Sequence, residues 1–150
     1  MSKRIIHIGI DGDVDKSGYC EIGKTPFGKW EILHLDNLDF FDAIDRITHL
    51  VTTCPPEDFK ITVCIEAGWL NKSIHHVMKS NAHAAKIGTH VGSNHQVGRL
   101  FESFCKKNNI NYRLYKPTTS KWDAKMFKQV TGWEKRSNPE QRDAVRAAWI

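Results

Sequence analysis

The sequence predicts an α/β domain built on a mixed β-sheet, and two apolar runs are the main reason. RIIHIGI (4–10) and ITVCIEA (61–67) are continuous and rich in β-branched residues, so each is expected to form a buried strand. Strand-like and helix-like patterns alternate through the rest of the chain, which is typical of α/β proteins. With 150 residues, of which 40% are hydrophobic and 26% charged, a single domain over 1–150 can bury its own core.

The first third of the chain predicts a three-stranded antiparallel meander and then a helix. YCEI (19–22) is expected as the second strand and KWEILHL (29–35), which alternates in polarity, as the third. A helix is expected over Leu38–Thr52, with Asp36 or Asn37 as its N-cap. The apolar run 61–67 then supplies a central strand, expected to be parallel.

The middle of the chain predicts interrupted helical structure. The segment 71–86 is polar, rich in histidine and roughly helical, and Gly88, Gly92 and Ser93 are expected to interrupt it. A firmer helix is expected over Gln96–Lys107, where apolar residues recur at helical spacing. This apolar stripe is suited either to core packing or to a dimer interface.

The last third predicts one strand and two helices. INYRLYK (110–116) is expected as a strand and the segment 118–130 as a helix. Asn138 as N-cap, Pro139 at the first helical position and Gln141 three residues after the cap form a strong helix start. The complete prediction is therefore a mixed central sheet, a meander plus parallel strands, flanked by helices.

Charge and cysteine content limit the class of protein. The net charge of +5 permits a polyanionic partner such as nucleic acid. Trp122, Trp133 and Trp149 stand among the basic residues of the C-terminal third, where they would either stack on bases or pack in the core. The four cysteines show no CxxC pair, so a zinc ribbon is not expected. No secretory or membrane-spanning segment is recognisable, and a cytoplasmic protein with reduced thiols is expected.

Three acids at alternate positions follow the first strand in IGIDGDVDKSG. Asp11, Asp13 and Asp15 match the first ligands of a calcium-binding EF-hand loop. However, the sixth position of that loop holds Lys16 instead of glycine, and the twelfth holds Ile22 instead of glutamate. The flanking segments are also strands instead of helices, so an EF-hand is rejected.

A different metal site follows from the two apolar strands. Asp11 ends the first and Glu66 the second, and the carboxyl ends of parallel strands share one edge of a sheet. Glu140 and Asp143 are three residues apart, so both lie on one face of the last helix. Together these four acids predict an oxygen-rich site suited to Mg²⁺ or Mn²⁺.

The same residues carry a resemblance to a known family. The chain resembles RuvC-type members of the RNase H-like (retroviral integrase) superfamily, and the resemblance covers nearly the whole sequence in the expected order. Its motifs are IGID (8–11), SG (17–18), CIEAG (64–68), VGSNHQVGRLFESF (91–104), TG (131–132) and RDA (142–144).

This resemblance implies a fold, an activity and a set of catalytic residues. It implies an RNase H-like fold, hydrolysis of phosphodiesters with two Mg²⁺ or Mn²⁺ ions, and cleavage of branched DNA, typically four-way Holliday junctions, by a homodimer. Asp11, Glu66 and Asp143 match the catalytic acids of the family. Glu140 matches a further acid position, where Asp or His is more usual.

The chain also departs from the family pattern. Gly12-Asp13 replaces the usual Pro-Gly, which makes Asp13 and Asp15 extra charges, either outer-sphere or simply solvated. The segment 117–132 is longer than in well-known bacterial members. This length leaves open which of Lys121, Lys125 and Lys128 corresponds to the basic residue of the family's catalytic loop. Lys121 is the first choice for the residue that stabilises the phosphate, and Lys128 is the second.

DNA contacts are expected outside the acidic site. Trp69, beside Leu70, either wedges into a junction or covers the core. Histidines gather in 75–95, where DNA-facing or surface roles are expected and a zinc site fits no ligand signature. The phosphate contacts are expected from Lys72, Lys79, Lys86, Arg99, Lys125 and Lys128.

Two other functions remain open from the sequence. One is an RNase H-like nuclease acting on RNA–DNA hybrids or flaps, and the other is a catalytically silent DNA-binding scaffold. The presence of all three main acids disfavours the scaffold. A small RuvC-like protein also fits a phage or mobile-element product acting in a host cytoplasm.

Overall fold

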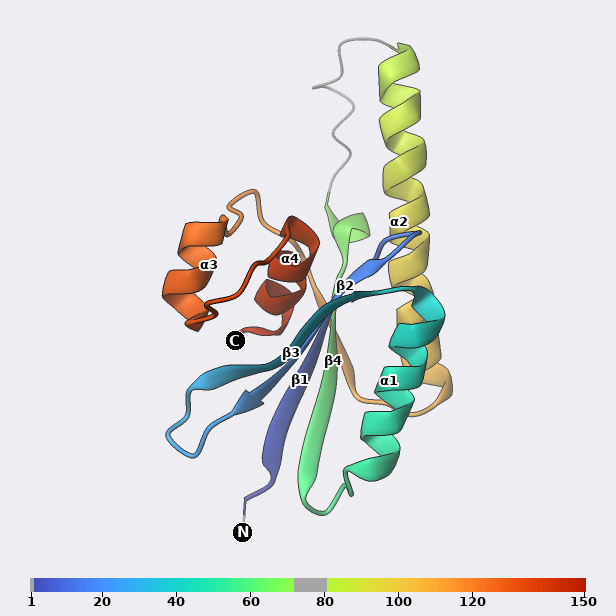
Figure 1. Ribbon diagram of the computed structural model, residues 1–150. Helices are drawn as coiled ribbons and strands as arrows, with labels where there is room; N and C mark the ends of the chain where they lie inside the picture. Colours follow the sequence, from blue (N-terminus) through green and yellow to red (C-terminus); the bar gives the residue numbers. More distant parts are fainter. Residues whose placement is uncertain (1, 72–80) are drawn as a thin grey trace.

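A five-stranded mixed sheet forms the centre of the molecule (Figure 1). The computed structural model describes residues 2–71 and 81–150, and for 81–88 it describes the helix backbone only. The strand order is β3-β2-β1-β4-β5; β1 pairs antiparallel with β2 and β2 with β3, whereas β1–β4 and β4–β5 are parallel. The predicted meander and parallel strands are confirmed. The strands are β1 (Arg4–Asp11), β2 (Ser17–Lys24), β3 (Trp30–Leu38), β4 (Phe59–Glu66) and β5 (Tyr112–Tyr115).

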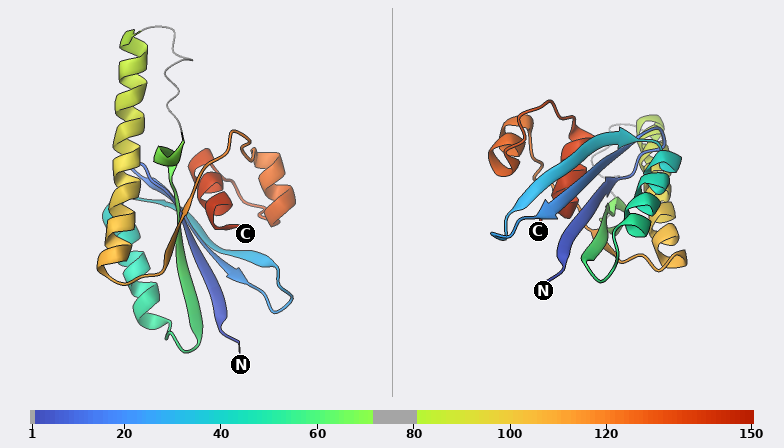
Figure 2. Two further views of the ribbon diagram at one scale, coloured as in Figure 1. Left: turned by 180° about the vertical axis from the view of Figure 1, so that it is seen from behind. Right: turned by 60° about the horizontal axis from the view of Figure 1, so that its bottom comes forward.

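Helices cover both faces of this sheet. α1 and α2 lie on one face and α3 and α4 on the other, and α2 extends well beyond the end of the sheet (Figures 1 and 2). Within the part of the chain that the structure describes, none of the helices has the length and apolar character required to cross a bilayer. The helices are α1 (Phe40–Thr53), the short 3-10 helix η1 (Gly68–Leu70), α2 (Asn81–Lys107), α3 (Ala124–Thr131) and α4 (Pro139–Ala148).

Alternation along the strands builds one hydrophobic core on each face. Ile8 and Ile10 of β1, with Val63 and Ile65 of β4, pack with α1 and α2. The intervening Cys64 belongs to the second core, which α3 and α4 cover. Of the apolar stripe predicted over 96–107, Phe101 and Cys105 are fully buried in the first core, so most of that stripe serves core packing. Leu100 is 45% exposed.

Two helices begin later than predicted. The N-cap of α1 is Asp39, whose carboxylate accepts a hydrogen bond from the backbone N–H of Asp42 at 2.8 Å, instead of Asp36 or Asn37. The reason is that β3 continues to Leu38, where it still pairs with Ser17 of β2. Likewise α3 begins at Ala124 instead of residue 118, with Asp123 as its N-cap.

The predicted interruption of the middle helix is wrong. α2 continues without a break from Asn81 to Lys107, through Gly88, Gly92 and Ser93. The Ser93 hydroxyl donates to the carbonyl oxygen of Thr89 at 2.9 Å, so it is satisfied within the helix. Each glycine costs a helix only about 1 kcal/mol, which burial of the C-terminal half of α2 can outweigh. Most of the helix predicted over 71–86 lies outside the described residues.

Two glycines let α4 lie directly on the sheet. A Cβ atom at Gly9 of β1 would overlap the carbonyl group of Ala144, and one at Gly18 of β2 would overlap the carbonyl group of Glu140. The predicted start of α4 is confirmed, with a capping box between Asn138 and Gln141. This close approach brings the first turns of α4 to the end of β1.

Candidate active site

Three carboxylates from three elements meet at the carboxyl edge of the sheet. Asp11 ends β1, Glu66 ends the neighbouring parallel strand β4, and Asp143 lies on α4. One carboxylate oxygen from each lies within 4.8 Å of the other two, and all three side chains are partly buried. These are three of the four acids predicted to share a site.

The charges of these carboxylates are poorly compensated by the protein. Burial, together with the nearby charges of Glu66 and Asp143, raises the pKa of Asp11 to about 8. Burial also raises the pKa of Glu66, against the opposing effect of Lys121. The cluster therefore resists full ionisation unless further positive charge is bound.

Lys121 is the predicted lysine that reaches this cluster. Its Nζ lies 3.0 Å from Oδ2 of Asp143 and 3.6 Å from Oε1 of Glu66. Partial burial disfavours the charged ammonium, but the nearby carboxylates outweigh this effect and raise the pKa of Lys121, so it stays protonated at neutral pH. The alternative, Lys128, is instead paired with Glu134 at 2.9 Å.

Glu140 lies near the cluster but not in it. Among the described residues, the set of acids with oxygens this close together is Asp11, Glu66 and Asp143. The charge of Glu140 nevertheless contributes to the raised pKa of Asp11. Glu140 therefore adds negative potential at the first turn of α4, and its predicted role as a direct ligand is not supported by this arrangement.

The donor set fits a hard divalent cation. All three groups offer oxygen, the ligand that Mg²⁺ and Mn²⁺ prefer, and their mutual repulsion would be relieved by a bound cation. We expect saturating Mg²⁺ or Mn²⁺, at about 100 times the dissociation constant, to stabilise the folded protein by about 2.7 kcal/mol. For a chain of this size that corresponds to a rise of roughly 5–10 °C in Tm.

Thermal unfolding in EDTA and in Mg²⁺ or Mn²⁺ measures this effect. Asp11→Asn should lose most of the rise in Tm, whereas Asp15→Asn, at an exposed position after the cluster, should keep it. Equal rises in the two variants would show that the cation binds elsewhere.

The extra aspartate after Gly12 holds its own loop together. Oδ1 of Asp13 accepts the backbone N–H of Asp15 at 2.9 Å, and Nδ2 of Asn94 on α2 donates to Oδ2 of Asp13 at 3.3 Å. Oδ1 of Asn94 in turn accepts the backbone N–H of Val14. Asp13 is therefore a structural residue that docks the loop on α2, whereas Asp15 is solvent-exposed as one alternative predicted.

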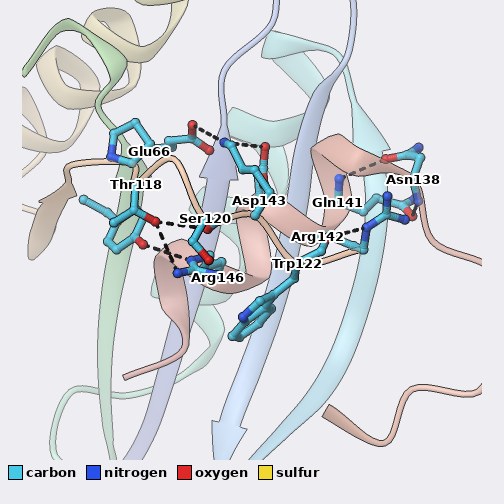
Figure 3. A network of polar contacts seen from close by, with 12 residues as sticks. Glu66, Thr118, Ser120, Trp122, Asn138, Gln141, Arg142, Asp143 and Arg146 are labelled. Carbon is cyan, nitrogen blue, oxygen red and sulfur yellow. Dashed lines mark hydrogen bonds and ion pairs between the residues drawn. The ribbon is translucent and has the colours of Figure 1, made fainter. Parts of the chain in front are cut away.

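Two arginines of α4 hold the irregular segment that carries Lys121 (Figure 3). Arg142 donates from Nε to the carbonyl oxygen of Trp122 at 3.0 Å. Arg146 donates to the hydroxyl groups of Tyr115 at 3.1 Å and Thr118 at 3.2 Å, and it stacks over the Trp122 ring. Arg142 belongs to the RDA motif, but the sequence assigns neither arginine a role. Their spacing of four, on either side of Asp143, is the sequence signal that places both on one helix face.

Removing Arg146 should therefore displace Lys121 without removing a carboxylate. For the phosphodiester cleavage that the family resemblance implies, we expect Arg146→Ala to lower the rate by about 10- to 100-fold, the range typical of residues that orient a metal site from outside it. Arg136→Ala, at an exposed position in the segment before α4, is the matched control. The double variant with Lys121→Ala should be no slower than Lys121→Ala alone, because both changes remove the same interaction. Additive losses would show that Arg146 does not act through Lys121.

The predicted aromatic contacts mostly serve packing. Trp69 packs against Gly98 of α2, with the ring of His95 at 6.1 Å and the Arg99 guanidinium at 5.6 Å from its ring centre. Leu70, the next residue, is 45% exposed. Trp122, Trp133 and Trp149 are partly buried against the second core, which favours the packing alternative for all three.

The predicted phosphate contacts do not gather at one place. Arg99 is exposed on α2, whereas Lys125 and Lys128 are exposed on α3, across the sheet. Lys72 and Lys79 lie outside the described residues, as do His75 and His76, and Lys86 belongs to the part of α2 without described side chains. Among the histidines whose side chains are described, neither His90 nor His95 belongs to a candidate metal cluster.

Comparisons with known proteins bear on the fold. No protein-family model matches this chain, and no curated protein matches it. Thermus thermophilus RuvC in complex with a Holliday junction substrate is similar, with a TM-score of 0.52 and 16% identity over 95% of this chain and 90% of that one. A second structure of Thermus thermophilus RuvC gives a TM-score of 0.51 with the same identity and coverage.

A weaker likeness is to a Fowlpox virus resolvase solved with Holliday junction DNA, with a TM-score of 0.49 and 10% identity over 95% of this chain and 93% of that one. At this level of identity, the two RuvC structures establish the fold. The chain has a RuvC-like form of the RNase H-like fold, as its motifs predict.

Proposed function

We propose that this protein is a metal-dependent endonuclease that cleaves branched DNA, with a four-way junction as its substrate. The observation that carries the proposal is the cluster of Asp11, Glu66 and Asp143, with Lys121 in contact with two of the three. The similarity in fold to RuvC, one of whose structures contains a Holliday junction substrate, supports this choice of substrate.

In this proposal each residue of the site has a distinct role. Asp11, Glu66 and Asp143 would together hold two Mg²⁺ or Mn²⁺ ions, since each offers a carboxylate oxygen to the cluster. When bound, such ions activate a water and stabilise the leaving oxygen of a phosphodiester. Lys121 would keep its positive charge beside the phosphate, and Arg142 and Arg146 would hold its segment in position.

The proposal extends to partners and surroundings. We expect a homodimer, because resolving a four-way junction requires two symmetric cuts, and a two-fold dimer presents two equivalent sites.

Exposed Leu70 would approach the junction beside the site in place of the packed Trp69. The cysteines are free in the structure, which agrees with action in a reducing cytoplasm. The proposed phosphate contacts remain Lys72, Lys79, Lys86, Arg99, Lys125 and Lys128.

Cleavage assays test this proposal directly. A labelled synthetic four-way junction, a linear duplex of the same sequence and an RNA–DNA hybrid are incubated with the protein and Mg²⁺ or Mn²⁺. Paired symmetric nicks in the junction, with little cutting of the duplex, are expected. Cutting of the hybrid alone would replace the proposed substrate with that of an RNase H, and binding without cutting of any substrate would leave a DNA-binding scaffold.

A further inference from the structure

A basic groove lies at the end of the sheet opposite the acidic cluster. Its cavity volume is about 460 Å³, and its lining includes His7, Lys24, Trp30, Lys60 and Arg113. These residues come from all five strands, near the amino ends of β1 and β4. In Figure 1 the lower ends of β1, β2 and β4 extend past α3 and α4, which lie beside the upper part of the sheet.

The basic side chains of this groove are not paired with acidic side chains of the described residues. Lys24 and Lys60 are exposed, and neither they nor Arg113 forms an ion pair with a carboxylate of a described residue. Arg113 donates from Nη2 to the carbonyl oxygen of Ala147 at 3.3 Å, while its buried Nε has no hydrogen-bond partner among the described residues.

The positive charges of the groove lie close enough to His7 to affect its pKa. Burial lowers the pKa of His7, its hydrogen bond to the carbonyl oxygen of Ala148 opposes this, and the positive charges of Arg113, Lys24 and Lys60 lower the pKa further. Three cations from three strands therefore act on one imidazole. Such a surface is complementary to an anion.

The aromatic ring in the groove is already engaged. His7 lies 4.5 Å from the Trp30 ring between centroids, and Nζ of Lys24 lies 5.4 Å from the ring centre. The indole N–H of Trp30 donates to a main-chain oxygen of Ile150. An inserted nucleobase would have to displace these contacts, whereas a phosphate can be met by the exposed ammonium groups alone. A sugar–phosphate backbone therefore fits the groove better than a stacked base.

We propose that this groove binds the phosphate backbone of a second segment of nucleic acid, separate from the strand at the catalytic carboxylates. His7 and Asp11 are four residues apart on β1, which corresponds to about 13 Å at the rise of a strand. The C-terminal end of α4 lies next to His7, whose ring is hydrogen-bonded to the carbonyl oxygen of Ala148. Two arms of a branched DNA could thus contact one protomer at opposite ends of the same strand. The choice of DNA as the polyanion rests on the proposed function.

Charge reversal tests the groove. Lys24→Glu/Lys60→Glu is compared with Lys106→Glu/Lys107→Glu, which changes the net charge equally at the end of α2. Binding to a labelled four-way junction and a linear duplex is measured in EDTA, so that no strand is cut, at several salt concentrations. The groove variant should bind the junction at least about tenfold more weakly than the control, and the slope of log K against log salt should fall by about 1.8 for two lost phosphate contacts.

The outcomes separate this inference from the proposed function. Equal affinities and salt slopes for the two double variants would overturn the groove, even if the wild type cuts junctions. A wild type that cuts no junction but shows the predicted difference in binding would overturn the nuclease and keep the groove. Competition at the groove by inorganic phosphate, without any difference in DNA binding, would indicate a small-anion site and overturn the inference. If the double variant unfolds at a lower temperature than the wild type, Lys60→Gln replaces it. The slope of log K against log salt should then fall by about 0.9.

Discussion

Replacing Asp11 with asparagine is expected to lower junction cleavage on the order of 10³-fold or more. Asp11 shares the cluster with Glu66 and Asp143 and is a proposed direct ligand, so its loss should exceed the 10- to 100-fold typical of residues that only orient a metal site. Single-turnover cleavage of a labelled four-way junction measures the effect. Asp15→Asn, which removes the same charge four residues later, should cut at nearly the wild-type rate.

Asp11→Asn should lower cleavage, but in the absence of metal it should make the folded protein more stable than the wild type as the pH rises. In the folded protein burial and neighbouring carboxylates raise the pKa of Asp11 from 3.8 to about 8. Between these two values the folded state binds more protons than the unfolded state, so the free energy of unfolding falls as pH rises from about 4 to about 8. Asparagine removes this dependence.

Urea unfolding in EDTA at pH 5 and pH 8 checks this expectation. The wild type should lose more stability between the two pH values than Asp11→Asn does. A variant that cleaves at the wild-type rate, or that has the same pH dependence of stability, would show that Asp11 is not at the centre of the charged cluster.

Replacing Gly9 with alanine should be the most destabilising of the changes considered. The new Cβ would overlap the backbone carbonyl of Ala144 and lie 2.7 Å from Sγ of Cys20, so α4 would have to move off the sheet. Because the obstacle is backbone and not a flexible side chain, we expect a loss of about 3 kcal/mol or more in the free energy of unfolding. Asp143 is carried by α4, so cleavage should fall even where the variant is folded.

Gly92→Ala is the matched control for this prediction. A Cβ at Gly92 on α2 would meet nothing within 4 Å, and alanine favours the helix, so this change should stabilise the protein by about 0.5–1 kcal/mol. Urea denaturation of the two variants at one pH makes the comparison. A loss at Gly9 no larger than the effect at Gly92 would contradict the close packing of α4 on β1.

Local patterns were sufficient for most of the elements and for the main acids. The β-branched runs ending in Asp11 and Glu66 predict two parallel strands with their carboxyl ends together, and the Asn138 capping box predicts the start of α4. The errors occur where a tertiary contact overrides a local signal. Because Leu38 pairs with Ser17, β3 is longer and α1 begins later than predicted. The C-terminal half of α2 packs on the core, so the helix continues through its glycines.

The sequence by itself determined which acids end which strands, and from these acids it predicts a cation site at one edge of the sheet. Only the tertiary structure decided which charges share a site. Lys121, rather than Lys125 or Lys128, reaches the carboxylates because Arg142 and Arg146 hold an irregular segment against α4. Glu140 and Asp143 share a helix face, yet Asp143 alone joins the cluster, because the position of a helix on a sheet depends on non-local contacts such as those at Gly9 and Gly18.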